Sequence, residues 1–237
     1  MITPEDFLAR WQSNKYIPEE PEWASRELVR YAPAIVERLN IPLSSKRFLT
    51  EAGLPLQPIR HVRFDLFDLW NNRFPAIPDI FPTDQPPPEY RRYRVIRVTE
   101  IAGPDSRLWP ITYYCVDEQE NGRVINFSYD EGWKVDLVNS SVEQFAEYCL
   151  LFRESRAWGQ QHFQKHLRRY ENKEIDSAEW LWYESADYRE ECTAYRRELL
   201  HHLERIDPDA MNSCGGWSGI ITDIYISIEE AEDLRSR

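Results

Sequence analysis

One string, Phe-Leu-Thr-Glu-Ala-Gly-Leu-Pro at residues 48–55, constrains the fold more than any other part of this chain. Gly53 stands where the C-terminus of a helix favours a residue at positive φ, because glycine has no Cβ to clash there. Pro55 then prevents the helix from continuing. We therefore expect a short helix that ends at Gly53 in a Schellman turn, with Leu49 packed against Leu54, and that passes directly into an extended segment.

The residues before this string predict two more helices and a serine cap. Thr3, followed by proline and two acids, is typical of the start of a helix. Apolar residues at three- and four-residue spacing predict a second helix over residues 22–39, which Pro33 should split or kink. Ser44 or Ser45 is the expected N-cap of the helix that ends at Gly53.

The middle of the chain predicts an antiparallel sheet. Residues 59–69 alternate between apolar and polar side chains, which indicates a strand. Four further segments are rich in β-branched and aromatic residues, and the last three are joined by short connections that end in glycine, at 118–122 and 130–132, so a meander is expected. These four predicted strands cover residues 93–101, 109–117, 123–129 and 133–138.

Six prolines occur in the connection between the first predicted strand and this meander, at residues 74–89. Proline breaks both helix and sheet hydrogen bonding, so this segment is expected to be an extended surface loop without regular structure. A rigid connector is the favoured interpretation, ahead of a ligand for a proline-binding module.

A capping pattern predicts a long helix after the meander. Ser140 and Glu143 have the spacing of a capping box. Apolar residues then recur at three- and four-residue intervals and predict one buried face, formed by Val142, Phe145, Ala146, Cys149 and Phe152.

The last third of the sequence is helical, aromatic and charged. Residues 158–205 predict helix with breaks near Asn172 and Ser185, followed by a polar turn at 207–209 and a last strand at 220–226. Helices, then strands, then helices and a strand indicate an α+β fold rather than alternating βαβ units.

The charge distribution limits which classes of partner the chain is expected to bind. The formal net charge of −12 opposes direct binding to nucleic acid, which needs clustered lysine and arginine. Residues 171–237 hold 17 acidic and 7 basic side chains, so most of the excess lies near the C-terminus. This stretch is either a solubilising surface or a negative face that steers a basic partner toward the chain.

Cysteine usage and hydropathy indicate a cytoplasmic protein without membrane contact. The four cysteines are widely spaced and form no CxxC pair, as expected of free thiols in a reducing compartment. No run of about 18 apolar residues is present, and the acidic N-terminus lacks the order of a signal peptide.

Patterns for catalytic, metal and cofactor sites are incomplete. Ser218 lies in a Gly-Trp-Ser-Gly string that lacks the last glycine of a nucleophile elbow. His162 and His166 have the spacing of a zinc helix without the adjacent glutamate, and His201 and His202 point to different helix faces. No nucleotide-binding glycine motif occurs either. We therefore expect no catalytic residues, no metal and no cofactor.

An aromatic and acidic stretch near residues 179–191 is the candidate binding patch. Such a stretch is more often core with a solvated flank, but tryptophan and tyrosine among acids also suit an interface for a basic protein. The expected partner-binding residues are Trp182, Glu184, Asp187, Glu190 and Glu191.

Three strings together resemble the SUKH superfamily, and most closely its fourth immunity-protein group. The first is the string at residues 48–55, which precedes the sheet. The second, Val-Asn-Ser-Ser-Val-Glu-Gln-Phe at 138–145, leads from the sheet into a helix. The third resembles the closing helix and Asp-Pro turn of the family, at 203–208, with Trp217 beyond it.

The resemblance extends over residues 30–150 and 190–227, and it implies a single domain at 1–237 with a twisted, mainly antiparallel sheet surrounded by helices. The proline-rich loop at 74–89 and a candidate helical insertion at 153–189 depart from the pattern. The implied function is non-catalytic immunity: binding to a cognate polymorphic toxin, such as a nuclease or deaminase. A regulatory or scaffolding protein of the same fold is the alternative, and a hydrolase or metal enzyme using His162, His166 or Ser218 is a third.

Overall fold

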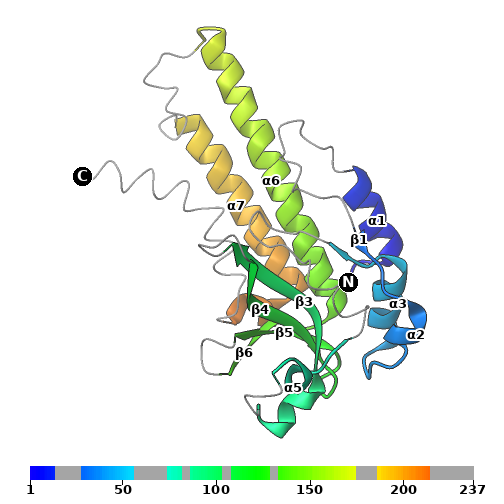
Figure 1. Ribbon diagram of the computed structural model, residues 1–237. Coiled ribbons are helices and arrows are strands. Elements are labelled where there is room, and N and C mark those ends of the chain that lie inside the picture. Colours follow the sequence, from blue (N-terminus) through cyan, green and yellow to red (C-terminus); the bar gives the residue numbers. More distant parts are fainter. Residues whose placement is uncertain are drawn as a thin grey trace.

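A four-stranded antiparallel meander lies at the centre of the protein, as the sequence predicts. The computed structural model describes residues 1–13, 28–55, 74–81, 86–102, 108–128, 133–174 and 186–213. Figure 1 shows β3 (Tyr93–Ala102), β4 (Leu108–Asp117), β5 (Arg123–Ser128) and β6 (Lys134–Asn139), which pair in this order. Asn121 and Gly122 turn the β4–β5 hairpin at φ 54° and 72°. The two expected strands at 59–69 and 220–226 lie outside the described residues.

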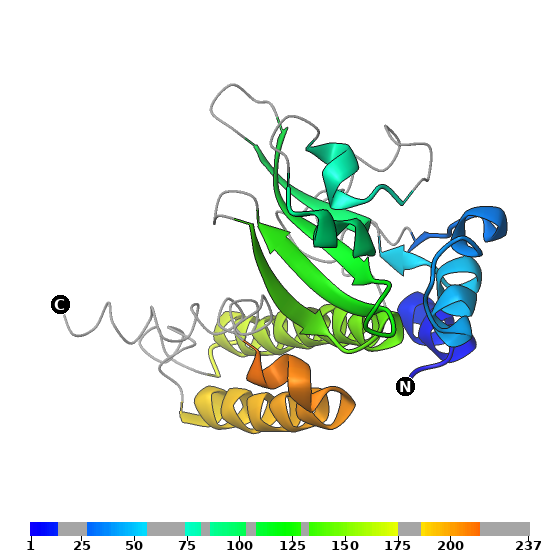
Figure 2. The ribbon, with the colours of Figure 1, turned by 90° about the horizontal axis from the view of Figure 1, so that it is seen from below.

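Helices cover both faces of the sheet, which confirms the α+β class. The long helices α6 (Val142–Glu171) and α7 (Ala186–Ile206) run side by side below one face in Figure 2. The short α5 (Ile77–Ile80) and the 3₁₀ helix η1 (Pro88–Arg92) lie over the other. Each face buries its own apolar cluster, because successive side chains of a strand point to opposite sides.

The N-terminal helix begins where the sequence predicts. In α1 (Pro4–Ser13), the Asp6 N–H donates to the Thr3 hydroxyl at 3.1 Å, which in turn donates to the Asp6 carboxylate. Phe7 and Trp11 are buried against the main core. Thr3 therefore caps the helix as expected.

The predicted second helix at 22–39 is wrong over much of its length. Within the described residues, β1 (Leu28–Val29) pairs antiparallel with β2 (Leu54–Pro55), and only α2 (Pro33–Val36) is helical. Pro33 is the first helical residue, where its missing N–H is not needed. The helical spacing of apolar residues around Leu28 is overridden because Leu28 pairs with Pro55, 27 positions later.

The helix α3 (Leu43–Glu51) ends at Gly53, whose φ of 77° confirms the prediction. A second reason for glycine is tertiary, because a Cβ at Gly53 would overlap the Val29 carbonyl of β1. The expected Schellman bond is replaced, since the Gly53 N–H donates to the Phe48 carbonyl at 2.9 Å and the Leu49 carbonyl accepts from Tyr31. Leu49 and Leu54 are nevertheless both fully buried in one apolar cluster.

The expected serine caps are wrong at two helices. No side chain caps α3, which follows Pro42, and Ser45 instead donates to Glu143 of α6 at 2.8 Å. At the start of α6 the cap is Ser141, whose hydroxyl accepts from the Gln144 N–H at 3.2 Å. Ser140, one residue earlier, is held by a partner remote in sequence. The predicted buried face of α6 is confirmed, with all five residues buried: Val142, Phe145, Ala146, Cys149 and Phe152.

Two other segments are more regular than predicted. The proline-rich stretch contains α5 and the start of η1, and Ala76 forms a bridge with Arg94 of β3, so its expected lack of regular structure is wrong there. The predicted polar turn at 207–209 is instead the start of α8 (Pro208–Asn212), capped by Asp207. In all three short helices proline lies in the first turn, where its missing N–H is not needed.

A buried cation links the sheet to the N-terminal elements. Arg97 of β3 is fully buried, and its Nη2 donates to the Leu54 carbonyl of β2 at 2.6 Å. Its guanidinium lies 5.9 Å from the centre of the Tyr31 ring, and the Tyr31 hydroxyl donates to the Ile96 carbonyl. Burial lowers the pKa of Arg97, because the charged form loses its hydration.

Candidate partner-binding surface

The outer half of α6 extends past the sheet (Figure 1). The helix has 30 residues and is therefore about 45 Å long. From Val142 to Phe152 most of its side chains are buried, whereas beyond Ser155 the described side chains are exposed or half-buried apart from His162. This half of α6, together with the adjoining half of α7, offers more open surface than the rest of the helix.

An aromatic stack joins the outer halves of α6 and α7. The Trp158 indole lies parallel to the Tyr195 ring at a centroid distance of 4.0 Å. One turn further along α6, the His162 imidazole stacks on the same indole at 4.7 Å. Trp158 and Tyr195 are half-buried, so part of the stack is accessible to solvent.

Glu191 extends this contact with charge. Its carboxylate lies 3.0 Å from His162 Nδ1 and 3.1 Å from Lys165 Nζ, so one side chain of α7 contacts two successive turns of α6. The two helices are therefore antiparallel neighbours, with Tyr195 beside Trp158 and Glu191 beside His162 and Lys165. On this register the first turn of α7 is level with residues 167–169.

The structure places three of the five expected binding residues on α7. Asp187 is in its first turn, Glu190 is exposed, and Glu191 is exposed but bound to α6. Trp182 and Glu184 lie outside the described residues. Glu190 and Glu191, adjacent in sequence, therefore differ in role: the first faces solvent and the second joins the helices.

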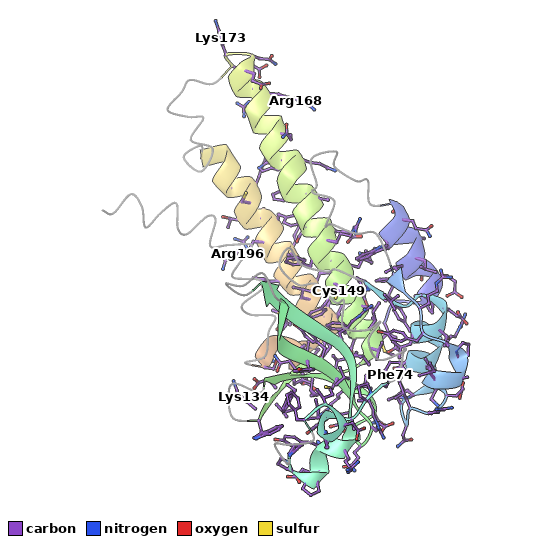
Figure 3. The ribbon with its side chains drawn as sticks, in the orientation of Figure 1. Phe74, Lys134, Cys149, Arg168, Lys173 and Arg196 are labelled. Carbon is purple, nitrogen blue, oxygen red and sulfur yellow. The ribbon has the colours of Figure 1, made fainter. Side chains whose placement is uncertain are left out.

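Basic residues gather at the end of α6, a feature that the sequence argument missed. Lys165, Arg168, Arg169 and Lys173 lie within nine positions at helical spacing, which was the available signal. The helix closes in a Schellman turn, with the Glu174 N–H donating to the Arg169 carbonyl at 2.8 Å and Lys173 at a φ of 59°. Arg168 and Lys173 are exposed at this end, as Figure 3 shows.

The three strings singled out in the sequence contact one another or the core. The buried Asp207 carboxylate accepts from the Asn139 amide at 3.1 Å, from the Ser140 N–H and hydroxyl at 2.6 and 2.8 Å, and from the Ala210 N–H at 3.2 Å. Ser45, in α3 three residues before the first string, donates to Glu143 of the second string. These hydrogen bonds hold the sheet, α3, α6 and α8 together.

Comparison with protein families decides what this scaffold is. The model of the SUKH-4 immunity protein family matches residues 19–223. The chain belongs to the SUKH-4 immunity protein family. No curated protein and no solved structure gives a significant match.

The SUKH-4 match includes both the proline-rich segment at 74–89 and the helical stretch at 153–189. In the structure the first part of that stretch continues α6 without a break as far as Glu171. Membership of this family supports a toxin-immunity role in general and a protein-binding rather than an enzymatic one.

Among the described residues of the SUKH-4 scaffold, no group of three or more histidine, cysteine, aspartate or glutamate side chains is placed to hold a metal ion. His162 stacks on Trp158 and contacts Glu191, while the His166 side chain and Ser218 lie outside the described part of the structure. Among the described helices, none has the length and apolarity to cross a membrane.

Proposed function

We propose that this chain is a cytoplasmic immunity protein that binds a cognate polymorphic toxin domain and blocks its active site without catalysis. The observation that carries the proposal is membership of the SUKH-4 immunity family over residues 19–223. Immunity of this kind requires a stable complex rather than a chemical step. The proposal is therefore about a binding surface.

The solvent-exposed outer half of the α6–α7 pair is the proposed location of that binding surface. Trp158 and Tyr195 are half-exposed aromatic side chains, the type that most often supplies the binding energy of an interface. Around them lie charged side chains that can align a partner before contact. The rigid stack between the two helices also reduces the entropy lost when this surface is occupied.

We place the acidic contacts at the start of α7 and in the segment before it. The residues proposed to meet the toxin are Trp182, Glu184, Asp187, Glu190 and Glu191. A toxin that acts on nucleic acid, such as a nuclease or a deaminase, needs a basic surface, and these acids would attract it. Because Glu191 also binds Lys165 and His162, Glu190 is the cleaner probe of direct contact.

Co-expression tests the proposal. The toxin domain encoded beside this gene is induced in a bacterial host, with and without the immunity protein, and growth and complex formation are measured. Rescue of growth together with a stable complex is the expected result. Absence of both overturns the proposal, and recovery of an endogenous protein in place of the toxin would favour the regulatory role.

A charge variant locates the surface. The Glu190→Lys protein should associate more slowly with the toxin at low salt, with the difference shrinking at high salt. Glu204→Lys changes the same charge at an exposed site on the inner half of α7 and serves as the matched control. Equal rates for the two variants would place the acidic contact elsewhere.

A further inference from the structure

The outer end of α6 has the opposite charge to the protein as a whole. The chain has 41 acidic and 29 basic side chains, yet residues 165–174 hold four basic and two acidic ones. Glu191 binds Lys165, and Glu174 lies 3.9 Å from Arg169. Among the described residues no ion pair involves Arg168 or Lys173, and both are exposed.

The backbone conformation of Lys173 is a second reason to assign a function to the positive charge at the end of α6. Lys173 occupies the left-handed position of the Schellman turn, at a φ of 59°, where glycine is the favoured residue. A lysine there is held in a less favourable conformation than glycine would be. Residues with a strained backbone conformation cluster at functional sites, so we expect the Lys173 side chain to have a function that uses its charge.

The helix dipole explains only part of the pattern. Cations in the last turn of a helix stabilise it, which accounts for a basic residue at 168 or 169. Lys173 lies beyond the last helical residue, and an uncharged glycine would close the turn without strain. Its charge therefore points outward, to something that approaches this end of α6.

The neighbouring start of α7 has the opposite sign. On the register fixed by the Glu191 contacts, Asp187 lies level with residues 167–169, and Glu190 follows one turn later. The next residue of α7, Glu191, binds Lys165 of α6. A partner that covers this end therefore meets positive charge from α6 and negative charge from α7.

We propose that the outer end of α6, through Arg168 and Lys173, binds an acidic surface on the toxin, beside the basic surface that meets α7. The inference rests on the proposed immunity function and adds the chemistry of the partner. The toxin presents carboxylates next to its basic residues, in a matching order. Two signs in a fixed order give this interface orientation and selectivity that a uniformly acidic face lacks.

Charge reversal with a matched control tests the inference. The double variant Arg168→Glu/Lys173→Glu is compared with Arg38→Glu/Arg123→Glu, which changes the net charge equally at exposed positions beside the N-terminal helices. Association rates with the purified toxin domain from the neighbouring gene are measured at several salt concentrations. The first variant should associate about tenfold more slowly at low salt than the second, with the gap closing at high salt.

Cross-linking with a carbodiimide gives an independent measurement, because it joins a lysine amine to a carboxylate only in direct contact. The chain has five lysines, and Lys134 is an exposed one at the other end of the molecule (Figure 3). Mass spectrometry should find Lys173, and not Lys134, linked to an aspartate or glutamate of the toxin.

The outcomes separate the inference from the proposed function. Wild-type binding with equal rates for both double variants, or a toxin link at Lys134 without one at Lys173, overturns the inference and leaves immunity intact. If the wild-type chain neither binds the toxin nor rescues growth, the proposed function itself fails.

Discussion

Asp207 binds Ser140 through both oxygens of its carboxylate, although the two residues are 67 positions apart. The Ser140 N–H donates to one oxygen at 2.6 Å and its hydroxyl donates to the other at 2.8 Å. Asp207 thereby fixes the start of α6 to the junction of α7 and α8. The Tyr148 hydroxyl lies 2.8 Å from the Leu203 carbonyl and so strengthens the same junction.

Removing this carboxylate should destabilise the protein strongly. Asp207→Ala leaves buried donors of Asn139 and Ala210 and half-buried donors of Ser140 without their acceptor, so the free energy of unfolding should fall by about 3 kcal/mol. Urea denaturation measures the change. Asp209→Ala, at an exposed position two residues later, should change it by no more than about 0.5 kcal/mol. Similar losses for both variants would contradict a specific role for Asp207.

Two glycines should respond to alanine in opposite directions. Gly53→Ala must place a Cβ onto the Val29 carbonyl at positive φ and should cost about 2–4 kcal/mol. Gly159 lies inside α6 with no described atom within 4 Å of the position of a Cβ, so Gly159→Ala should stabilise by about 0.5–1 kcal/mol. Thermal or urea unfolding distinguishes them, and a destabilised Gly159→Ala protein would show that this space is needed.

Lys173→Gly should raise stability. Glycine adopts the left-handed conformation of the α6 terminus without the Cβ clash, so we expect a gain of about 0.5–1 kcal/mol. Lys173→Ala keeps the strain while removing the charge and should give little or no gain. Unfolding in urea compares the two, and equal stabilities would show that the backbone at this position is not strained.

Adjacent glutamates on α7 should differ in their effect on stability. Glu191→Ala removes the contacts of one carboxylate with His162 and Lys165 and should cost about 1 kcal/mol, a modest loss because Glu191 and Lys165 are largely exposed. Glu190→Ala should be close to neutral, since its side chain faces solvent. Paired urea titrations check this, and the reverse order would refute the described contact between α6 and α7.

Alkaline pH should weaken the fold through buried thiols. Burial raises the pKa of Cys149 from 9.0 to about 12, although Arg97 nearby partly opposes the shift. Between about pH 9 and 12 the unfolded chain loses this proton while the folded protein keeps it, so stability falls as pH rises, by up to about 1.4 kcal/mol per pH unit. Urea unfolding at pH 8 to 10.5 should show a shallower slope for Cys149→Ala, and an unchanged slope would exclude Cys149 as a source.

Elements defined by local signals could be predicted from the sequence. The meander, the end of α3 at Gly53 and the buried face of α6 follow from period, turn residues and helical spacing. Several failures share one cause, a partner remote in sequence. Leu28 pairs with Pro55, and Ser45 and Ser140 bind side chains of α6 and of the α7–α8 junction, so local capping rules misplace both serines.

The candidate surface was harder to predict than the fold. The sequence showed that residues 171–237 are rich in acids, but it did not show which side chains these acids contact. Glu191 contacts Lys165 only because α7 packs antiparallel to α6. The basic end of α6 was present as a spacing of charges within an acidic chain. The feature that draws attention to this basic end is the left-handed backbone of Lys173. That conformation could not be predicted from the sequence, because the usual signal for it is a glycine and position 173 is a lysine.

The division of α6 into a buried half and an open half has an evolutionary consequence. Residues before Ser155 are constrained by the core on several sides, so most replacements there would reduce stability. Beyond it the described side chains, apart from His162, meet solvent on at least one side, and new ones can be tried with little penalty to folding. One continuous helix thus combines a half whose side chains are fixed by the core with a half whose side chains can be replaced, so descendants of this chain can acquire a new outer surface while keeping their architecture.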